Sequence, residues 1–216
     1  DRRCKLKEIP TFYELLSYNC YPMNCACGPF FEFADFRRFV NREGQYENPP
    51  LDLVKATLTF LYGFVCFGGI VVTGMVSNTD ILVSKDFAEL NWFMQMFHCT
   101  IVLENMKFAG YSLWFFADGV NILSGFSYNG KDKDGSNKYD INHGINYLGC
   151  ELATTPRELI NNWNYQTTNW LKYYIYVRIE DGKKENRGLA ALVTFGTSAF
   201  WHGFMPCYYV FFLYVH

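Results

Sequence analysis

The sequence has 216 residues, with 19 basic and 21 acidic side chains and a formal net charge of −2 at pH 7. This near-neutral balance excludes the strongly positive surface that nucleic-acid binding requires, so no nucleic acid is expected as a partner. Half of the residues are hydrophobic and 19% are aromatic, a composition that excludes disordered and linker-type sequence.

Two short helices are predicted in the first 50 residues. Pro10 precedes a possible helix at 11–16. Further along, aromatic side chains recur with helical spacing between 33 and 40, and charged side chains occupy the other side. We expect this second helix to lie in a membrane interface, with an amphipathic helix of a soluble protein as the alternative.

Two long stretches, 56–79 and 188–216, contain no Asp, Glu, Lys or Arg. Uncharged apolar stretches of this kind are candidate membrane spans, because about 20 helical residues cross the roughly 30 Å hydrocarbon core. The alternative is a buried helix of a large soluble protein. Two such stretches in one short chain favour an integral membrane protein.

Between these two stretches the pattern is mixed. Residues 87–126 alternate uncharged runs with a few charged positions such as Asp118, and they predict one or two helices whose charges face the protein interior. Residues 127–155 are the most polar part of the chain and predict exposed turns. A helix then starts at Pro156, because Thr155 is a suitable cap and the sequence contains a Thr-x-x-Glu capping box.

His202 lies within the second uncharged stretch. An ionisable group at membrane depth is costly and marks a functional site by default, although a structural histidine bonded to a neighbouring helix is the alternative. Pro206 cannot donate to the carbonyl of His202, so a helix there would kink or end, and Gly203 adds flexibility. Irregular backbone at this depth predicts a cavity, where a neutral imidazole can act as a general base. Pairing with Ser198, one turn earlier, is a weaker alternative.

The segment Trp201-His202-Gly203-Phe204-Met205-Pro206-Cys207-Tyr208-Tyr209 closely resembles the W-H-G-x-x-P-G-Y signature of the membrane-bound O-acyltransferase family. Upstream, Trp163-Asn164-Tyr165-Gln166-Thr167 resembles the second family signature, W-N-x-x-T. The chain departs from the family at Cys207, where Gly is usual. Further stretches resemble the lysophospholipid acyltransferase branch: Leu15–Asn19, Cys27–Phe31, Asp118–Asn121 and Tyr128–Asp132.

This resemblance implies an all-α, polytopic transmembrane helical bundle in the endoplasmic reticulum. Residues 1–216 are then expected to be an internal piece of that membrane domain, incomplete at both ends, with interfacial helices and a helix kinked at His202–Pro206. The implied reaction transfers a fatty acyl group from acyl-CoA to a lysophospholipid hydroxyl. By motif, His202 is the general base, and Asn164 orients His202 or a reacting group by hydrogen bonding.

Acyl-CoA is thus implied as a co-substrate, the lysophospholipid and membrane lipids as partners, and no bound cofactor is expected. Eight cysteines give no zinc-ligand set and no disulfide framework, so no metal is expected either. Lys172 and Arg178 are candidates for CoA phosphates, although basic residues near a span usually face headgroups. Trp163, Trp201 and Tyr208 are further candidate substrate contacts, with packing or an interfacial position as the simpler role.

Two alternatives remain open from the sequence. The same fold can acylate a sterol, a diacylglycerol or a protein serine instead of a lysophospholipid. In a different class, the chain is a non-catalytic membrane transporter or scaffold in which His202 and the broken helix form a binding or gating site.

Overall fold

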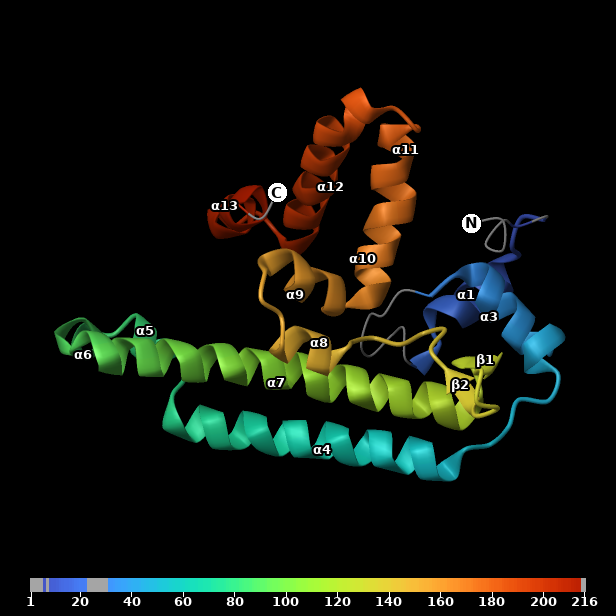
Figure 1. Cartoon of the computed structure of the whole chain (residues 1–216), viewed down its shortest axis with the longest axis horizontal. Helices are drawn as coiled ribbons and strands as arrows, with labels where there is room; N and C mark the ends of the chain where they lie inside the picture. The colour runs from blue at the N-terminus through green and yellow to red at the C-terminus, as the bar shows by residue number, and fades with distance from the viewer. Residues whose placement is uncertain (1–5, 7, 23–30, 215–216) are drawn as a thin grey trace. The chain divides into compact units, whose positions relative to one another are not determined.

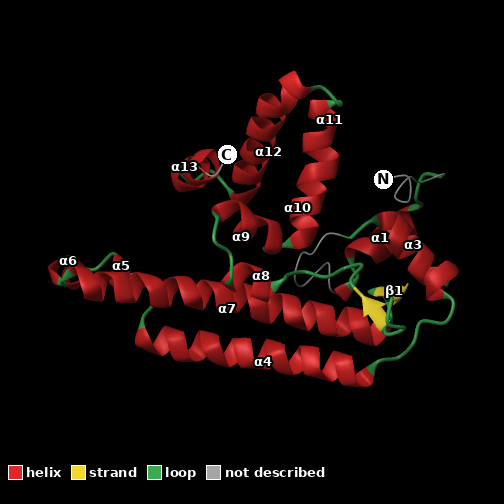
Figure 2. Cartoon of the chain, in the orientation of Figure 1, coloured by secondary structure: helices red, strands yellow, loops and turns green. Residues whose placement is uncertain are grey.

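The computed structural model describes residues 6, 8–22 and 31–214. Residues 27–30 of the family resemblance, and 215–216 at the end of the second uncharged stretch, lie outside the described residues. The described chain is mostly helical, with one small β-hairpin (Figure 2). It divides into two compact units: unit 1 holds the described residues up to 40 together with 144–214, and unit 2 holds 41–143.

Two long helices, α4 (Leu53–Val76) and α7 (Trp92–Ser124), run side by side through unit 2 (Figure 1). The two helices approach closely at Gly63 of α4, because this residue has no Cβ and so leaves room for the Phe116 ring of α7. A Cβ added at Gly63 would lie 2.9 Å from that ring. The buried Ser112 hydroxyl also donates a hydrogen bond to the carbonyl of Gly63 at 3.0 Å. Small residues and polar side chains of this kind commonly join helices within membranes.

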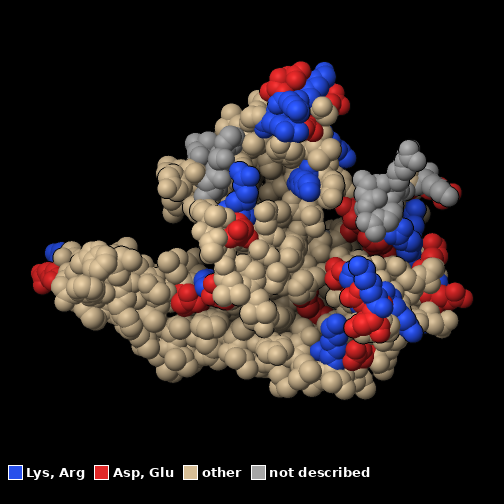
Figure 3. Space-filling model, viewed as in Figure 1, with Lys and Arg blue, Asp and Glu red and all other residues tan. Residues whose placement is uncertain are grey.

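One helical stretch in the described part of the chain, Leu53–Leu82, is long and apolar enough to cross a membrane, with a mean hydropathy of 1.9. It comprises α4 and the short helix α5 (Thr79–Leu82). The side chains of Val54 and Val65 are 72% and 70% exposed, whereas a core helix of a soluble protein would bury them. Figure 3 accordingly shows a broad uncharged surface over α4. The helix predicted from the uncharged stretch 56–79 is confirmed as α4, which begins at Leu53 and ends at Val76.

A β-hairpin follows α7, so the all-α prediction is wrong for this segment. Its strands, β1 (Tyr128–Lys131) and β2 (Asn137–Tyr139), pair antiparallel with Tyr128 opposite Tyr139. Residues 132–136, which lie within the region 127–155 where exposed turns are predicted, form the tip. The turn residues predicted from the sequence are confirmed, and the strands on either side of them are an addition that the structure makes.

The hairpin is stable because Tyr139 anchors it to the two long helices. The Tyr139 ring packs with Ala56 of α4 and Ile122 of α7, and its hydroxyl donates to the carbonyl of Pro50 at 3.0 Å. A two-stranded ribbon alone is marginal in water, and packing against helices supplies the missing stability. The remaining short elements of unit 2 are η2 (Gly44–Tyr46) and α6 (Lys85–Glu89).

Unit 1 consists of short helices from both ends of the sequence. Before residue 41, where the chain passes into unit 2, these are α1 (Phe12–Asn19) and α3 (Phe33–Val40), which confirm the two helices predicted there. The interfacial position of the second stays a prediction. From residue 144 onward the elements are α8 (Tyr147–Glu151), α9 (Pro156–Asn162), α10 (Tyr165–Leu171), η3 (Lys172–Tyr176), α11 (Val177–Glu180), η4 (Lys184–Asn186), α12 (Arg187–His202) and α13 (Pro206–Tyr214).

The predicted helix start at Pro156 is confirmed. The Thr155 hydroxyl oxygen accepts a hydrogen bond from the backbone N–H of Glu158 at 3.2 Å. In a regular capping box, the Glu158 carboxylate would accept a hydrogen bond from the backbone N–H of Thr155. Here it accepts from the backbone N–H and the hydroxyl of the preceding residue, Thr154, both at 2.8 Å.

The second uncharged stretch forms two helices rather than one span, because α12 ends at His202 and α13 begins at Pro206. The helical run of α10, η3 and α11 lies beside α12 (Figure 1). Its middle part, η3, is a π-helical segment, a local widening of the helix that is frequent at functional sites. The described part of the chain is thus mostly helical and holds one candidate span, and the polytopic bundle stays a prediction.

Candidate active site

His202 is the last residue of α12, and the chain breaks immediately after it. Gly203 has φ +120° and ψ −174°, a backbone region that essentially only glycine adopts. Pro206 has no N–H to donate to the carbonyl of His202, so the helix cannot continue, and Pro206 instead begins α13. The predicted interruption is confirmed, and it leaves the histidine at the junction of two helices.

The imidazole of His202 lies among aromatic rings. The ring centroids of Tyr208 and Phe212, both on α13, lie 5.4 and 5.3 Å from its own, and the Phe212 ring is tilted by only 29° from it. Trp201 packs edge-on at 5.0 Å. The side chain of His202 forms no hydrogen bond or ion pair with any residue that the structure describes. Packing therefore fixes the ring, and its nitrogens stay available to a bound molecule.

Asn164 joins α9 to α10 in the left-handed backbone conformation, with φ 48° and ψ 63°. Asparagine is one of the few residues that tolerate this region. Its side-chain Oδ1 accepts from the backbone N–H of Thr167 at 3.4 Å and so caps α10. Its Nδ2 donates to none of the described residues. The cap thus fixes the amide oxygen and leaves the N–H groups of the amide available.

Asn164 and His202 both belong to unit 1 but lie on separate elements. Their side chains, both described, are not hydrogen-bonded to each other, so this structure contains no direct bond by which Asn164 would orient His202. Ser198 is buried at 6% exposure, and its hydroxyl does not bond to His202 either. The Ser-His pair considered from the sequence is therefore not formed here.

The other predicted contact residues lie in three places. Trp201 and Tyr208 are brought to His202, as described above. The cationic groups of Lys172 and Arg178 instead lie over the rings of Tyr173 and Tyr174, at 5.4 and 5.0 Å from the ring centroids. Trp163 is the residue that follows the last residue of α9 and caps that helix, directly before Asn164.

The departure at Cys207 does not strain the backbone. The described residues with positive φ other than glycine are Arg42, Asn164 and Asp181, so Cys207 needs no glycine-like conformation. It lies exposed in the first turn of α13. A small thiol is therefore compatible with this turn.

Replacing Gly203 by alanine is expected to destabilise the protein by about 1–3 kcal/mol, because the backbone region is closed to residues with a Cβ. Space is not the cause, since the nearest atom to an added Cβ is 4.0 Å away, on Tyr208. The matched control is Gly196→Ala in the middle of α12, where a Cβ meets nothing within 4 Å and helix propensity favours alanine. Thermal unfolding of the purified protein in detergent measures both, and equal effects would contradict the strained turn.

A polar pair in unit 2 was not foreseen. Asp118 of α7 is 5% exposed, and its Oδ2 lies 2.7 Å from Nδ1 of His143. The pair lines a pocket of about 270 Å³ together with Ser127, whose buried hydroxyl has no hydrogen-bond partner among the described residues. The position of Asp118 in an apolar run indicated an inward-facing charge, but nothing in the sequence pointed to His143 as its partner.

Replacing Asp118 by alanine is expected to lower the free energy of unfolding by about 1–3 kcal/mol, because it removes a charge-assisted hydrogen bond from a buried site. Glu89→Ala is the control, since Glu89 is exposed at the end of α6 and such changes usually stay within about 0.5 kcal/mol. Chemical denaturation monitored by tryptophan fluorescence compares the two. A stability loss no larger for Asp118 than for Glu89 would contradict a structural role of the pair.

A family model described as MBOAT, the membrane-bound O-acyltransferase family, matches residues 3–215. The chain is 30% identical over 234 residues to "Membrane-bound glycerophospholipid O-acyltransferase 1" of Mus musculus, covering 99% of this chain and 45% of that protein. It is 28% identical over 227 residues to "Lysophospholipid acyltransferase 6" of Drosophila melanogaster, covering 95% and 30%. For "Lysophospholipid acyltransferase" of Saccharomyces cerevisiae the identity is 29% over 222 residues, covering 93% and 36%. The chain thus spans less than half the length of these relatives.

Proposed function

The chain belongs to the membrane-bound O-acyltransferase family, and from that premise we propose that the protein transfers a fatty acyl group from acyl-CoA to a hydroxyl group of a lysophospholipid. Similarity to proteins named as lysophospholipid and glycerophospholipid acyltransferases, along almost the whole chain, supports this acceptor class. The proposed location is a membrane, the endoplasmic reticulum, in keeping with the apolar and exposed α4.

The observation that carries the proposed chemistry is the helix break at His202. A general base needs a fixed ring, a nitrogen that no protein group occupies, and access to the proton it removes. His202 has these properties: its ring is packed against Tyr208 and Phe212, its nitrogens form no bond with described residues, and its side chain is exposed.

In the proposed reaction, His202 accepts the proton of the lysophospholipid hydroxyl while that oxygen attacks the carbonyl carbon of the thioester. A C–O ester bond forms and the C–S bond breaks, so the sulfur leaves with the bonding electron pair. The proton then passes from the imidazole to the CoA thiolate, which restores the neutral histidine. General-base assistance of this kind contributes about 10²–10⁴-fold to the rate.

Asn164 acts in this proposal through the substrate rather than through His202. The Oδ1 atom of Asn164 accepts a hydrogen bond from the backbone N–H of Thr167, so the amide is held in one orientation, and Nδ2 has no hydrogen-bond partner among the described residues. A fixed N–H donor is suited to the oxygen of the thioester, which gains negative charge as the bond forms. The left-handed cap would therefore fix the orientation of a catalytic amide.

Both substrates are amphiphiles. In this proposal, much of the rate enhancement comes from holding them together in one dry cavity. Trp201 and Tyr208 are proposed to contact the reacting groups, because both pack against His202. Lys172 and Arg178 lie exposed on the helical run that Asn164 begins and are proposed to meet the phosphates of CoA. Trp163, beside Asn164, is proposed to contact a lipid chain.

The acceptor class is tested with the full coding sequence expressed in microsomes that lack background activity. Labelled acyl-CoA is supplied with lysophospholipids, a sterol, a diacylglycerol or a serine peptide, and the labelled products are separated. We expect ester formation with one or more lysophospholipids. Transfer to the sterol, diacylglycerol or peptide alone would contradict the proposal, and a folded wild type that acylates no acceptor would favour the transporter or scaffold.

A further inference from the structure

The turn that carries Asn164 is held on both sides by one short segment, which leads into α8. On one side, the backbone N–H of Asn146 donates to the carbonyl of Asn162 at 3.1 Å. On the other side, the backbone N–H of Tyr165 donates to the carbonyl of Gly144 at 2.9 Å. All of these residues belong to unit 1. Both sides of the turn are therefore tied to the same piece of chain.

A pair of side-chain amides strengthens this attachment. Nδ2 of Asn146 donates to Oδ1 of Asn162 at 2.9 Å, and the same oxygen accepts from the Tyr165 hydroxyl at 3.3 Å. Oδ1 of Asn146 accepts from the backbone N–H of Gly149 at 3.1 Å, and Nδ2 of Asn162 donates to the carbonyl of Glu158 at 2.8 Å. Both ends of each amide are thus engaged, so neither amide can flip without losing its hydrogen bonds. We call Asn146 and Asn162, with the bonds that join them, the amide clamp.

Gly149 of α8 leaves the space that the amide clamp needs. A Cβ added at this residue would collide with the side-chain amide of Asn162 and would lie 2.7 Å from Nδ2 of Asn146. Glycine within a helix costs stability relative to alanine. Its presence in the short helix that Asn146 caps is explained by this close approach.

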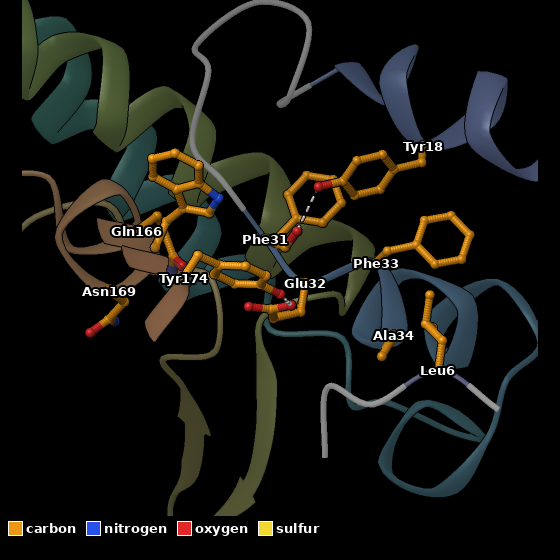
Figure 4. Close-up of a pocket in the computed structure, with 10 residues that line it drawn as sticks. Leu6, Tyr18, Phe31, Glu32, Phe33, Ala34, Gln166, Asn169 and Tyr174 are labelled. Carbon is orange, nitrogen blue, oxygen red and sulfur yellow. Dashed lines mark hydrogen bonds between the residues drawn. The ribbon is translucent and has the colours of Figure 1, made fainter. Parts of the chain in front are cut away.

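The helical run that Asn164 begins is also fixed farther along. The hydroxyl of Tyr174, in η3, donates to the carboxylate of Glu32 at 2.6 Å, which Figure 4 shows as a dashed line. Both residues line a pocket of about 250 Å³ in unit 1, together with Gln166 of α10. Because the run is held at Tyr174, the contacts at its beginning determine how the amide of Asn164 is presented.

We propose that Asn146 is a positioning residue for acyl transfer, which acts through Asn162 to hold Asn164 in place. The inference rests on the proposed function, in which a fixed N–H of Asn164 stabilises the thioester oxygen. A left-handed backbone at a residue other than glycine persists where the surrounding contacts hold it, and the amide clamp supplies such contacts. A displacement of about 1 Å at a reacting group can cost on the order of 10²-fold in rate. Hydrogen bonds outside the reacting groups can therefore control turnover.

Asn146→Asp tests the amide clamp in the full-length protein. The carboxylate can still accept from the backbone N–H of Gly149 and so cap α8, but it cannot donate to Oδ1 of Asn162. We expect kcat to fall by about 10–100-fold with little change in KM, because the donor acts on charge that develops in the transition state. Asn161→Asp is the matched control and should match the wild type, since this exposed neighbour forms no side-chain hydrogen bond with described residues.

Two further variants separate positioning from a general structural role. Asn162→Asp keeps the acceptor of the amide clamp and loses the donation to Glu158, so it should lower kcat less than Asn146→Asp does. In an Asn164→Gly background the positioned amide is gone, so adding Asn146→Asp should not lower kcat further. An undiminished effect of Asn146→Asp in that background would overturn the proposal. A loss in Asn162→Asp as large as that in Asn146→Asp would overturn it as well.

Hydrogen exchange tests the amide clamp without the reaction. Exchange is followed by mass spectrometry of peptides that cover residues 160–168, in the full-length protein in detergent. Asn146→Asp should exchange these amide hydrogens about five- to tenfold faster than the wild type, and Asn161→Asp should not. Faster exchange supports the clamp even where the wild type transfers no acyl chain, a result that would contradict only the reaction. Unchanged exchange in Asn146→Asp would overturn the clamp, whatever the activity.

Discussion

Replacing His202 by alanine is expected to lower kcat for acyl transfer by about 10²–10⁴-fold, because the variant loses its general base. The protein should remain folded, since the side chain is exposed and forms no hydrogen bond with described residues. The rate is measured in microsomes with labelled acyl-CoA and a saturating lysophospholipid, normalised to the amount of protein.

Ser198→Ala is the matched control for this variant. Ser198 lies one helical turn before His202, yet its buried hydroxyl does not bond to the imidazole. Direct transfer to the lysophospholipid therefore predicts that this variant keeps most of the wild-type rate. Loss of activity in Ser198→Ala with an intact fold would instead indicate a serine nucleophile and a covalent acyl-enzyme. Near wild-type activity in His202→Ala would remove the histidine from the mechanism.

Replacing Asn164 by aspartate is expected to lower kcat by about 10²–10³-fold, the usual effect of removing one donor to a developing negative charge. The carboxylate can still accept from the backbone of Thr167 and tolerates the left-handed conformation, so α10 keeps its cap. Activity and thermal unfolding measured on the same preparation separate the loss of the donor from a loss of structure.

Two further variants complete this test. Asn164→Gly removes the whole side chain at a position with positive φ, so it should cost only a few tenths of a kcal/mol in stability and be as inactive as the aspartate variant. Asn164→Ala should be less stable by about 1–2 kcal/mol, because it loses the cap and strains the backbone. If the aspartate variant kept full activity, the residue would be a structural cap alone.

The sequence predicted most local features of the fold and left its long-range features open. Charge-free composition was enough to predict the helix over 56–79, and a missing N–H at Pro206 was enough to predict the break after His202. The hairpin at 128–139 was missed because its stability comes from packing of Tyr139 on two distant helices. Local propensity does not contain that information.

In the candidate site, too, the local features follow from the sequence and the long-range contacts do not. His202 and Asn164 were identified by motif, and their local backbone was within reach of simple rules for proline and asparagine. The contact of Glu32 with Tyr174, and that of Asp118 with His143, joins residues far apart in the chain. One sequence without an alignment gives no signal for such pairs, so the two pockets became visible only in the structure.

The most direct test of the account measures release of CoA thiol from acyl-CoA by the purified full-length protein, with and without lysophospholipid. Direct transfer assisted by His202 predicts thiol release that requires the lysophospholipid, equals the ester formed and is largely lost in His202→Ala. Release without an acceptor, or release that persists undiminished in His202→Ala, would contradict the account.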